Sequence, residues 1–302
     1  MQAKQKILFI INPISGITQK KRIPEKIAKY LDHTIYDAEI RYTLYRHHAV
    51  VLAKEAVEEQ FDVVVAIGGD GSIHEVSSSL VNTDVALAVI PLGSGNGWAR
   101  HFKIPLNVED AIKLLNKKNK IINADTCTIN GRHFINCAGV GFDGAVANHF
   151  ATTKLRGFFS YIFSTLRQYA IFKPIAYEII MDHAMVKNKY FMISVMNGSQ
   201  FGYNIKSVPH AKIDDGILDI LLIRPFPKWW TPIMILHTIT NTLLYSRFVT
   251  LFHSSNVEIL MKEASYLQLD GEPVKVRRRL MIHTYNKNLK MLVPNKFHYV
   301  KT

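Results

Sequence analysis

The sequence predicts an α/β domain that is followed by a mostly antiparallel β domain. Strand-like apolar runs alternate with helical patterns up to about residue 120, and strand-like runs dominate afterwards. The chain has 302 residues, which is long for a single hydrophobic core. We therefore expect a doubly wound α/β domain over 1–123 and a β-rich domain over 124–284. A C-terminal segment, about 285–302, could pack back on the first domain.

The first domain is predicted from alternating strands and helices. Continuous apolar runs at 6–11, 62–67 and 85–90 are typical of a parallel sheet that is covered on both faces, and 38–45 alternates like a strand. The spacing of apolar residues predicts helices over 23–31, 47–60, from Ser72 to Leu80, and over 107–118. In the second of these helices, Val50, Ala53 and Val57 share one face. Ser72 is the expected cap of the third.

The second domain is predicted from short strands and turn signals. Asn130-Gly131 predicts a type I′ hairpin turn within residues 125–138. The remaining predicted elements are strands at 176–182, 190–198, 217–223, 256–261 and 266–270, and helices at 155–172 and 228–248.

Charge and cysteine content limit the class of protein. A formal net charge of +13 favours anionic partners such as acidic lipid surfaces or phosphorylated ligands. Nucleic acid is not expected, because no RNA-binding or helix-turn-helix signature is present. Cys127 and Cys137 lack metal or redox spacing and fit a reducing cytosol. Pro232 and His237 interrupt the most apolar stretch, so no membrane-spanning helix is predicted.

Three glycine-rich loops follow predicted strands of the first domain: NPISG at 12–16, GGDGS at 68–72 and PLGSGN at 91–96. Glycines let backbone N–H groups approach a phosphate, and a following helix adds a positive end. One such loop alone could be a tight turn, but three at one sheet edge favour phosphate binding. Asp70 would hold Mg²⁺ or orient an attacking hydroxyl, unless it is only an Asx-turn residue.

These loops, in this order, resemble the diacylglycerol kinase catalytic-domain superfamily. NCAGVGFDGAV (136–146), AKIDDGILDILLI (211–223) and LQLDGEPV (267–274) extend the resemblance over nearly the whole chain. The superfamily includes soluble bacterial lipid kinases, sphingosine kinases and ceramide kinases, and is distantly similar to NAD kinases and 6-phosphofructokinases. The resemblance implies an ATP-dependent, Mg²⁺-assisted lipid kinase with a nucleotide cleft between its two domains and a β-rich domain that holds the acyl chain of the lipid substrate.

The resemblance also implies which residues bind the nucleotide. Ser72 and Ser94 stand where threonine is commoner and keep the hydroxyl, whereas His74 stands where asparagine is commoner. The implied nucleotide-binding residues are Asn12, Pro13, Ser15, Gly16, Thr43, Gly68, Gly69, Gly71, Ser72, Glu75, Gly93, Ser94, Gly95 and Asn96.

The remaining roles follow from the same resemblance. Glu272 in DGEP is the implied general base and Asp70 the second catalytic carboxylate, although DGEP is also strong turn chemistry. Asp143 is implied near the substrate head group. The DDG turn would hold a structural Mg²⁺ through the Asp215 carboxylate and the backbone carbonyls of Lys212 and Ile217, unless it is only a turn.

A lipid substrate has to be reached at a membrane. Trp229, Trp230 and the aromatic stretch from Phe158 to Tyr169 fit an interfacial protein, although each aromatic residue alone is expected in the core. We expect a cytoplasmic protein in peripheral contact with the inner face of the membrane. Exposed strand edges would allow a homodimer. The alternatives left open are a NAD-kinase-like enzyme for a non-lipid hydroxyl and a non-catalytic nucleotide-binding membrane sensor.

Overall fold

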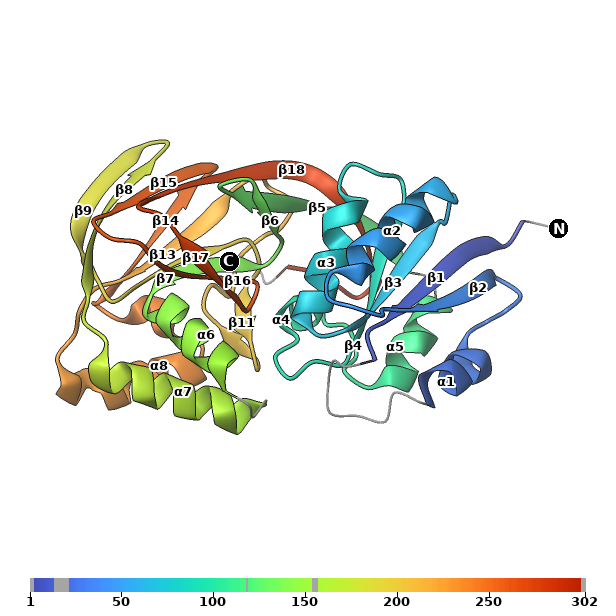
Figure 1. The fold of residues 1–302 in the computed structure, drawn as a ribbon, viewed down its shortest axis with the longest axis horizontal. Coiled ribbons are helices and arrows are strands. Elements are labelled where there is room, and N and C mark those ends of the chain that lie inside the picture. Colours follow the sequence, from blue (N-terminus) through green and yellow to red (C-terminus); the bar gives the residue numbers. More distant parts are fainter. Residues whose placement is uncertain (1–2, 14–21, 118, 154–156, 300–302) are drawn as a thin grey trace. The chain divides into compact units, whose positions relative to one another are not determined.

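The computed structural model describes residues 3–13, 22–117, 119–153 and 157–299. The chain forms two compact units (Figure 1), which consist of Met1–Asp125 with Asn286–His298, and of Thr126–Tyr285 with Tyr299–Thr302. We call them unit 1 and unit 2. Strands β5 (Lys120–Ile129) and β18 (Arg279–Val293) each begin in one unit and end in the other.

Unit 1 is built on a parallel sheet in the order β2-β1-β3-β4, which the end of β18 extends in parallel beside β4. β1, β3 and β4 are short apolar runs, and β3 and β4 are buried along their whole length. Such strands need helices on both faces of the sheet. The four strands are β1 (Gln5–Ile11), β2 (Tyr36–Tyr42), β3 (Val63–Gly68) and β4 (Ala86–Pro91).

Helices cover this sheet as the alternating sequence predicts. Ile27 of α1 and Ile112 of α5 pack in one cluster with alternate residues of β1, β3 and β4, while α2 and α3 pack against each other. The Asn107 side chain caps α5 by accepting hydrogen bonds from the N–H groups of Glu109 and Asp110. The helices are α1 (Ile23–Tyr30), α2 (His48–Glu58), α3 (Asp70–Leu80), α4 (Gly97–His101) and α5 (Val108–Leu115).

The predicted inner face of α2 was wrong in part. Ala53 is buried as expected, but Val50 and Val57 are only half-buried. The buried positions are Ala49, Leu52, Ala53 and Ala56. The small alanines let α2 pack against α3, whereas the prediction from the sequence was based on the larger apolar residues Val50 and Val57.

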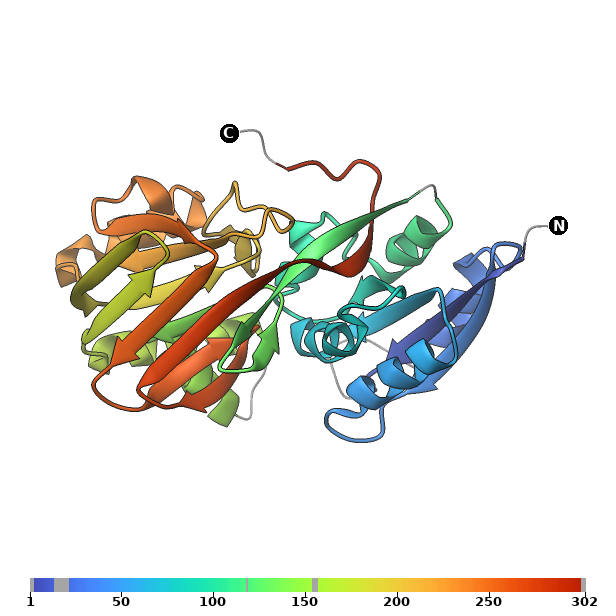
Figure 2. The ribbon, with the colours of Figure 1, turned by 90° about the horizontal axis from the view of Figure 1, so that it is seen from above.

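Unit 2 is a sandwich of two mostly antiparallel sheets. One contains β15, β8 and β9 beside β18, and Figure 2 shows the long strand β18 next to β15. The other has the order β14-β13-β10-β7-β16-β17. The strands are β6 (Arg132–Phe134), β7 (Cys137–Gly141), β8 (Ile175–Met181), β9 (Ala184–Tyr190), β10 (Met192–Met196), β11 (Gln200–Gly202), β12 (Ile205–Lys206), β13 (Leu218–Ile223), β14 (Val249–Ser254), β15 (Asn256–Met261), β16 (Ser265–Leu269) and β17 (Glu272–Val276).

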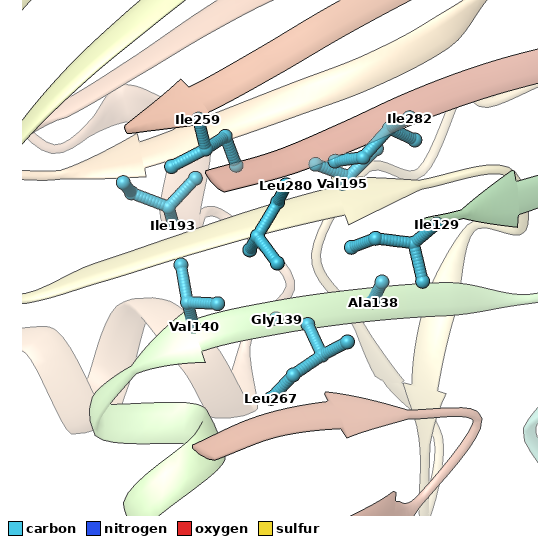
Figure 3. Close-up of a pocket in the computed structure, with 10 residues that line it drawn as sticks. All are labelled: Ile129, Ala138, Gly139, Val140, Ile193, Val195, Ile259, Leu267, Leu280 and Ile282. Atoms are coloured by element: carbon cyan, nitrogen blue, oxygen red, sulfur yellow. The ribbon is translucent and has the colours of Figure 1, made fainter. Parts of the chain in front are cut away.

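The interior of the sandwich is a closed apolar core. Side chains of both sheets meet there, among them Val140, Ile193, Ile259 and Leu280 (Figure 3). The space that they enclose has no room for a water molecule. This core therefore offers no preformed chamber for an acyl chain, although we expected the β-rich domain to hold one.

Helices cover the outer side of the second sheet. α6 (Phe142–Thr152) packs on β7, β16 and β17, and α7 (Phe158–Ile171) packs on α6. The stretch 228–248 was predicted as a helix but is broken into η2 (Lys228–Trp230), α8 (Thr231–Ile239) and η3 (Leu243–Tyr245). Asn241 has a positive φ of 58°, which ends the helical path. The arrangement of both units confirms the predicted fold class.

Candidate active site

The carboxyl ends of the parallel strands bring the predicted phosphate loops together in unit 1. After β1, the Asn12 side chain donates to Ser72 Oγ at 3.4 Å. After β2, the N–H of Thr43 donates to the carbonyl of Ile11 at 2.9 Å, and Thr43 is buried. Residues from three separate loops therefore meet at one sheet edge, as a phosphate site requires. Ser15 and Gly16 lie outside the described residues, and Pro13 is exposed.

The loops after β3 and β4 touch through two glycines. A Cβ on Gly93 would lie 2.6 Å from the Cα of Gly69, and a Cβ on Gly69 would lie 3.2 Å from the Cα of Gly93. Real side chains do not fit at the shorter distance, so these backbones approach each other because both residues are glycine. The contact fixes the spacing of the GGDG and GSGN loops.

Gly93→Ala is expected to destabilise the protein by roughly 1–3 kcal/mol, because the new methyl group overlaps the backbone of Gly69. Gly69→Ala should cost less, since its Cβ has more room. Chemical denaturation measures both effects, with exposed Ser94→Ala as the control in the same loop. A Gly93→Ala protein as stable as the wild type would show that the two loops can separate freely.

Asp70 is the first residue of α3, and Gly69 is its cap. Its Oδ1 atom accepts from the backbone N–H of Trp98 at 3.4 Å, so the carboxylate faces the start of α4 after the GSGN loop. Ser72 is not the helix cap that the sequence predicted. Its hydroxyl instead contacts Asn12 from within the first turn. Asp70 thus lies at the positive end of α3, among the glycine loops.

Asn96 shapes the loop after β4. It has a positive φ of 49°, and its side-chain amide donates to the carbonyl of Gly93 at 2.7 Å. Its Oδ1 atom is buried and has no hydrogen-bond partner among the described residues. Ser94 is exposed, and the carbonyl of Gly95 accepts from the Arg100 side chain. The structure therefore leaves one polar atom of this loop for a bound group.

Glu75 lies one turn further along α3 than the loop residues. Its carboxylate is 3.4 Å from Nδ1 of His47, the residue that precedes α2. Glu75 therefore links α3 to α2.

Gly68 ends β3 and pairs with Pro91 of β4. The carbonyl of Gly68 accepts from the N–H of Leu92 at 2.7 Å.

Glu272 lies in unit 2, at the start of the edge strand β17. Asp270 and Gly271 have positive φ values of 47° and 92° and form a two-residue turn that pairs Glu272 with Leu269. Glu272 is exposed. The turn interpretation of DGEP is confirmed, and the turn holds the Glu272 backbone in a fixed register.

The two carboxylates of this turn differ in what they contact. Asp270 is buried and accepts hydrogen bonds at 2.9 Å from the backbone N–H groups of Ile135, Asn136 and Cys137. A carboxylate whose oxygens accept several backbone N–H groups is held in place and in turn fixes the backbone that donates to it. Asp270 therefore has a structural task, whereas Glu272 is an exposed residue.

Asp143 lies in the first turn of α6, which follows β7 directly. It is 8% exposed, and its Oδ2 atom has no hydrogen-bond partner among the described residues. The side chain lies over Gly139, where any Cβ would be 2.1 Å from Oδ2. Burial raises the pKa of Asp143 to about 7. A carboxyl group of this kind can change its protonation state near neutral pH.

Asp143→Asn is expected to remove a pH dependence of stability. Because the folded pKa of Asp143 is about 7 and its ordinary value is 3.8, folding favours the protonated form. The native state is therefore most favoured below about pH 4 and loses stability as the pH rises to about 7. Over this range the free energy of unfolding of the wild type should fall relative to Asp143→Asn, by at most on the order of 4 kcal/mol.

Denaturation of both proteins between these pH values tests this expectation, with exposed Glu263→Gln as the control. Parallel pH profiles for the wild type and Asp143→Asn would show that the carboxyl group is solvated rather than buried.

The predicted structural Mg²⁺ turn has a simple geometry. The Asp215 side chain accepts from the N–H of Ile217 at 3.1 Å, and Asp215, Lys212 and Ile217 are all exposed. In the described part of the chain, no group of three or more His, Cys, Asp or Glu residues could hold a metal ion. One carboxylate and two carbonyls fit a weakly held Mg²⁺ that keeps most of its waters. The metal at this turn stays a prediction.

Sequence reasoning missed a contact between a carboxylate and an imidazole next to this turn. Asp219 of β13 is buried and lies 2.8 Å from Nδ1 of His253 on β14. Burial raises the pKa of Asp219 to about 6, while His253 opposes the shift. Only strand pairing reveals the contact, because the two residues are far apart in sequence.

Comparison with known families identifies two domain models that match this chain. The diacylglycerol kinase catalytic domain matches residues 6–129, and the YegS C-terminal NAD kinase beta sandwich-like domain matches residues 136–282. The two matches together account for nearly all of both units, with only a short gap between them.

Curated relatives are similar along most of their length. A "Probable lipid kinase YegS-like" of Chromohalobacter salexigens is 28% identical over 240 residues, which cover 78% of this chain and 77% of that protein. A diacylglycerol kinase of Bacillus subtilis is 26% identical over 274 residues, which cover 87% of this chain and 88% of that protein.

Solved structures share the fold. A crystal structure of a Bacillus anthracis protein matches with a TM-score of 0.82 at 23% identity, and covers 99% of this chain and 100% of that one. A diacylglycerol kinase of the same organism gives a TM-score of 0.73 at 19% identity with the same coverage. The chain therefore belongs to the diacylglycerol kinase catalytic-domain superfamily, a family of kinases, as its motifs predicted.

Proposed function

We propose that this kinase transfers the γ-phosphate of ATP to the hydroxyl of a lipid, of the diacylglycerol or sphingoid-alcohol kind, with the help of Mg²⁺. The observation that carries the proposal is the contact of Gly69 with Gly93, which brings two glycine loops and Asp70 to the carboxyl ends of β3 and β4. Backbone N–H groups at such an edge are suited to a nucleoside triphosphate.

Each carboxylate has a separate role in this proposal. Asp70 lies among the phosphate loops and is the carboxylate that would hold Mg²⁺ on the phosphates or orient the attacking hydroxyl. Bound Mg²⁺ would neutralise charge that develops on the transferred phosphoryl group. Glu272, exposed on its fixed hairpin, accepts the proton of the lipid hydroxyl.

Asp143 is the proposed contact for the lipid head group. Its buried Oδ2 atom lacks a hydrogen-bond donor among the described residues, so a substrate hydroxyl could satisfy it. No comparable observation favours the alternative of a NAD-kinase-like enzyme for a non-lipid hydroxyl. A non-catalytic nucleotide sensor would have no use for the two carboxylates of Asp70 and Glu272.

Transfer of label from radiolabelled ATP tests the proposed function. The acceptors are diacylglycerol, a sphingoid base and a polyprenol alcohol, each in detergent micelles, with NAD as the non-lipid acceptor. Label in at least one lipid is expected. Label in NAD alone, or ATP binding with no transfer to any acceptor, would contradict the proposal.

A further inference from the structure

Helix α7 exposes its apolar side chains and turns hydroxyl side chains inward, which is the reverse of an ordinary surface helix. Its outward side carries Phe159, which is 85% exposed, together with exposed Phe163 and Leu166. Its inward side carries hydroxyl groups: Ser164 is fully buried, and Ser160 lies 3.2 Å from Thr153 of the segment after α6. A helix that only covered a sheet would bury its apolar side.

Helix α8 continues this apolar side. Met234 points inward into a cluster with Leu221 and Leu243, while Leu236 and Ile239 are exposed. α7 and α8 lie next to each other (Figure 1), and the hydroxyls of Tyr169 and Thr231 are hydrogen-bonded. We call the exposed side of α7 and α8, together with the adjoining η2 and η3, the apolar face. Its exposed members are Phe159, Ile162, Phe163, Leu166, Ile171, Trp229, Ile235, Leu236, Ile239 and Tyr245.

The charge around the apolar face has one sign. Residues 144–177 contain no Asp or Glu, and neither do residues 220–257. Exposed basic side chains border the helices instead, namely Arg167, Lys173, Arg224, Lys228 and Arg247. Exposed apolar side chains on helices whose own and flanking sequence carries basic but no acidic residues are complementary to an anionic lipid bilayer, which offers acyl chains below a layer of negative head groups.

We propose that the apolar face is a membrane-binding surface, which lies in the head-group region of an anionic bilayer. α7 and α8 would insert Phe163, Leu166 and Leu236 among the acyl chains, while the basic border contacts lipid phosphates. None of the helices in the described part of the chain has both the length and the hydropathy of a membrane span, so the binding is peripheral. The inference rests on the proposed lipid kinase function, because it supplies the route to a lipid acceptor.

The same helix connects the membrane to the proposed head-group contact. Tyr161, on the inward side of α7, is close enough to Asp143 that burial and then the Asp143 charge raise the pKa of the tyrosine. Tyr161 also packs on Phe150 of α6, with ring centroids 5.6 Å apart. The hydroxyl-rich inner side of α7 thus faces the region of Asp143. Since the sandwich core is closed, an acyl chain can stay in the bilayer while the head group moves toward Asp143.

Co-sedimentation with vesicles tests the surface without any phosphoryl transfer. The wild type should bind vesicles of phosphatidylcholine and phosphatidylglycerol in equal parts, and bind phosphatidylcholine alone more weakly. The double variant Phe163→Glu with Leu236→Glu should bind the mixed vesicles about 10- to 100-fold more weakly, because two side chains that would insert among the acyl chains are lost and two negative charges are added. Met185→Glu, on exposed strand β9, is the matched control and should bind as the wild type does.

Tryptophan fluorescence provides a second readout on the wild type itself. Trp229 is 68% exposed on the apolar face, whereas Trp98 is buried in unit 1. Trp230, the third tryptophan, packs beside Trp229 with ring centroids 5.1 Å apart. Lipids brominated on the acyl chains should therefore quench the wild type, and a variant that combines Trp229→Phe with Trp230→Phe should lose most of this quenching.

Two results would overturn the inference. One is that the double variant binds the mixed vesicles as strongly as the Met185→Glu control does. The other is a wild type that does not bind vesicles but forms a dimer in light scattering, which the double variant dissociates, because the apolar face would then be an interface between two copies. Label transfer to a short-chain, monomeric diacylglycerol by the double variant separates a failure of this surface from a failure of the kinase function.

Discussion

Asp70→Asn is expected to lower the rate of phosphoryl transfer by about 10³-fold or more, because it removes the carboxylate that lies among the phosphate loops. The amide keeps the size of the side chain and can still lie beside the N–H of Trp98, so the fold should persist. Steady-state kinetics with saturating lipid measure kcat. Calorimetry without Mg²⁺ should show that the variant still binds ATP.

Asp37→Asn is the matched control for this prediction. Asp37 is an exposed aspartate on β2 of the same unit, and its replacement should leave kcat unchanged. Equal kcat values for Asp70→Asn and the wild type would assign Asp70 to the turn alone, which is the alternative that the sequence left open.

Glu272→Gln is expected to reduce kcat by about 10²- to 10⁴-fold while the affinity for ATP stays the same, because only proton acceptance from the lipid hydroxyl is lost. Glu272→Ala should abolish transfer in the same way. The turn of Asp270 and Gly271 fixes the backbone of Glu272, so neither change should disturb the strand pairing with Leu269. A kinetic assay over a range of pH measures the effect.

Asp270→Asn separates catalysis from structure at the same hairpin. Asp270 holds three backbone N–H groups of residues 135–137, so its replacement should lower the free energy of unfolding, which Glu272→Gln should not do. Full turnover by Glu272→Gln, together with a folded but inactive Asp270→Asn, would move the role of base to Asp270.

Local sequence signals predicted most of unit 1. Continuous apolar runs gave β1, β3 and β4, and glycine-rich loops marked the ends of these strands. The direct contact of Gly69 with Gly93 could not be predicted, because it depends on how two neighbouring loops pack in space. For the same reason the sequence misplaced the start of α3, which begins at Asp70 rather than after Ser72.

Long-range contacts explain what the sequence missed in unit 2. The DGEP turn was visible in the sequence. The hydrogen bonds of Asp270 were not, because their donors Ile135, Asn136 and Cys137 lie 135, 134 and 133 positions away along the chain. Helix α7 was predicted from its composition, yet Phe159 and Phe163 are exposed where a core position was the simpler expectation. The rule that apolar residues face inward assumes water on the outside, and α7 does not follow it.

The most direct test of the central claim is the transfer of label from radiolabelled ATP to an extractable lipid, compared between the wild type and Asp70→Asn. We predict labelled phospholipid from the wild type and at least about 10³-fold less from Asp70→Asn, at equal protein and equal ATP binding. Equal label from both proteins, or label in no lipid at all, would contradict the assignment of this chain as a lipid kinase that works through Asp70.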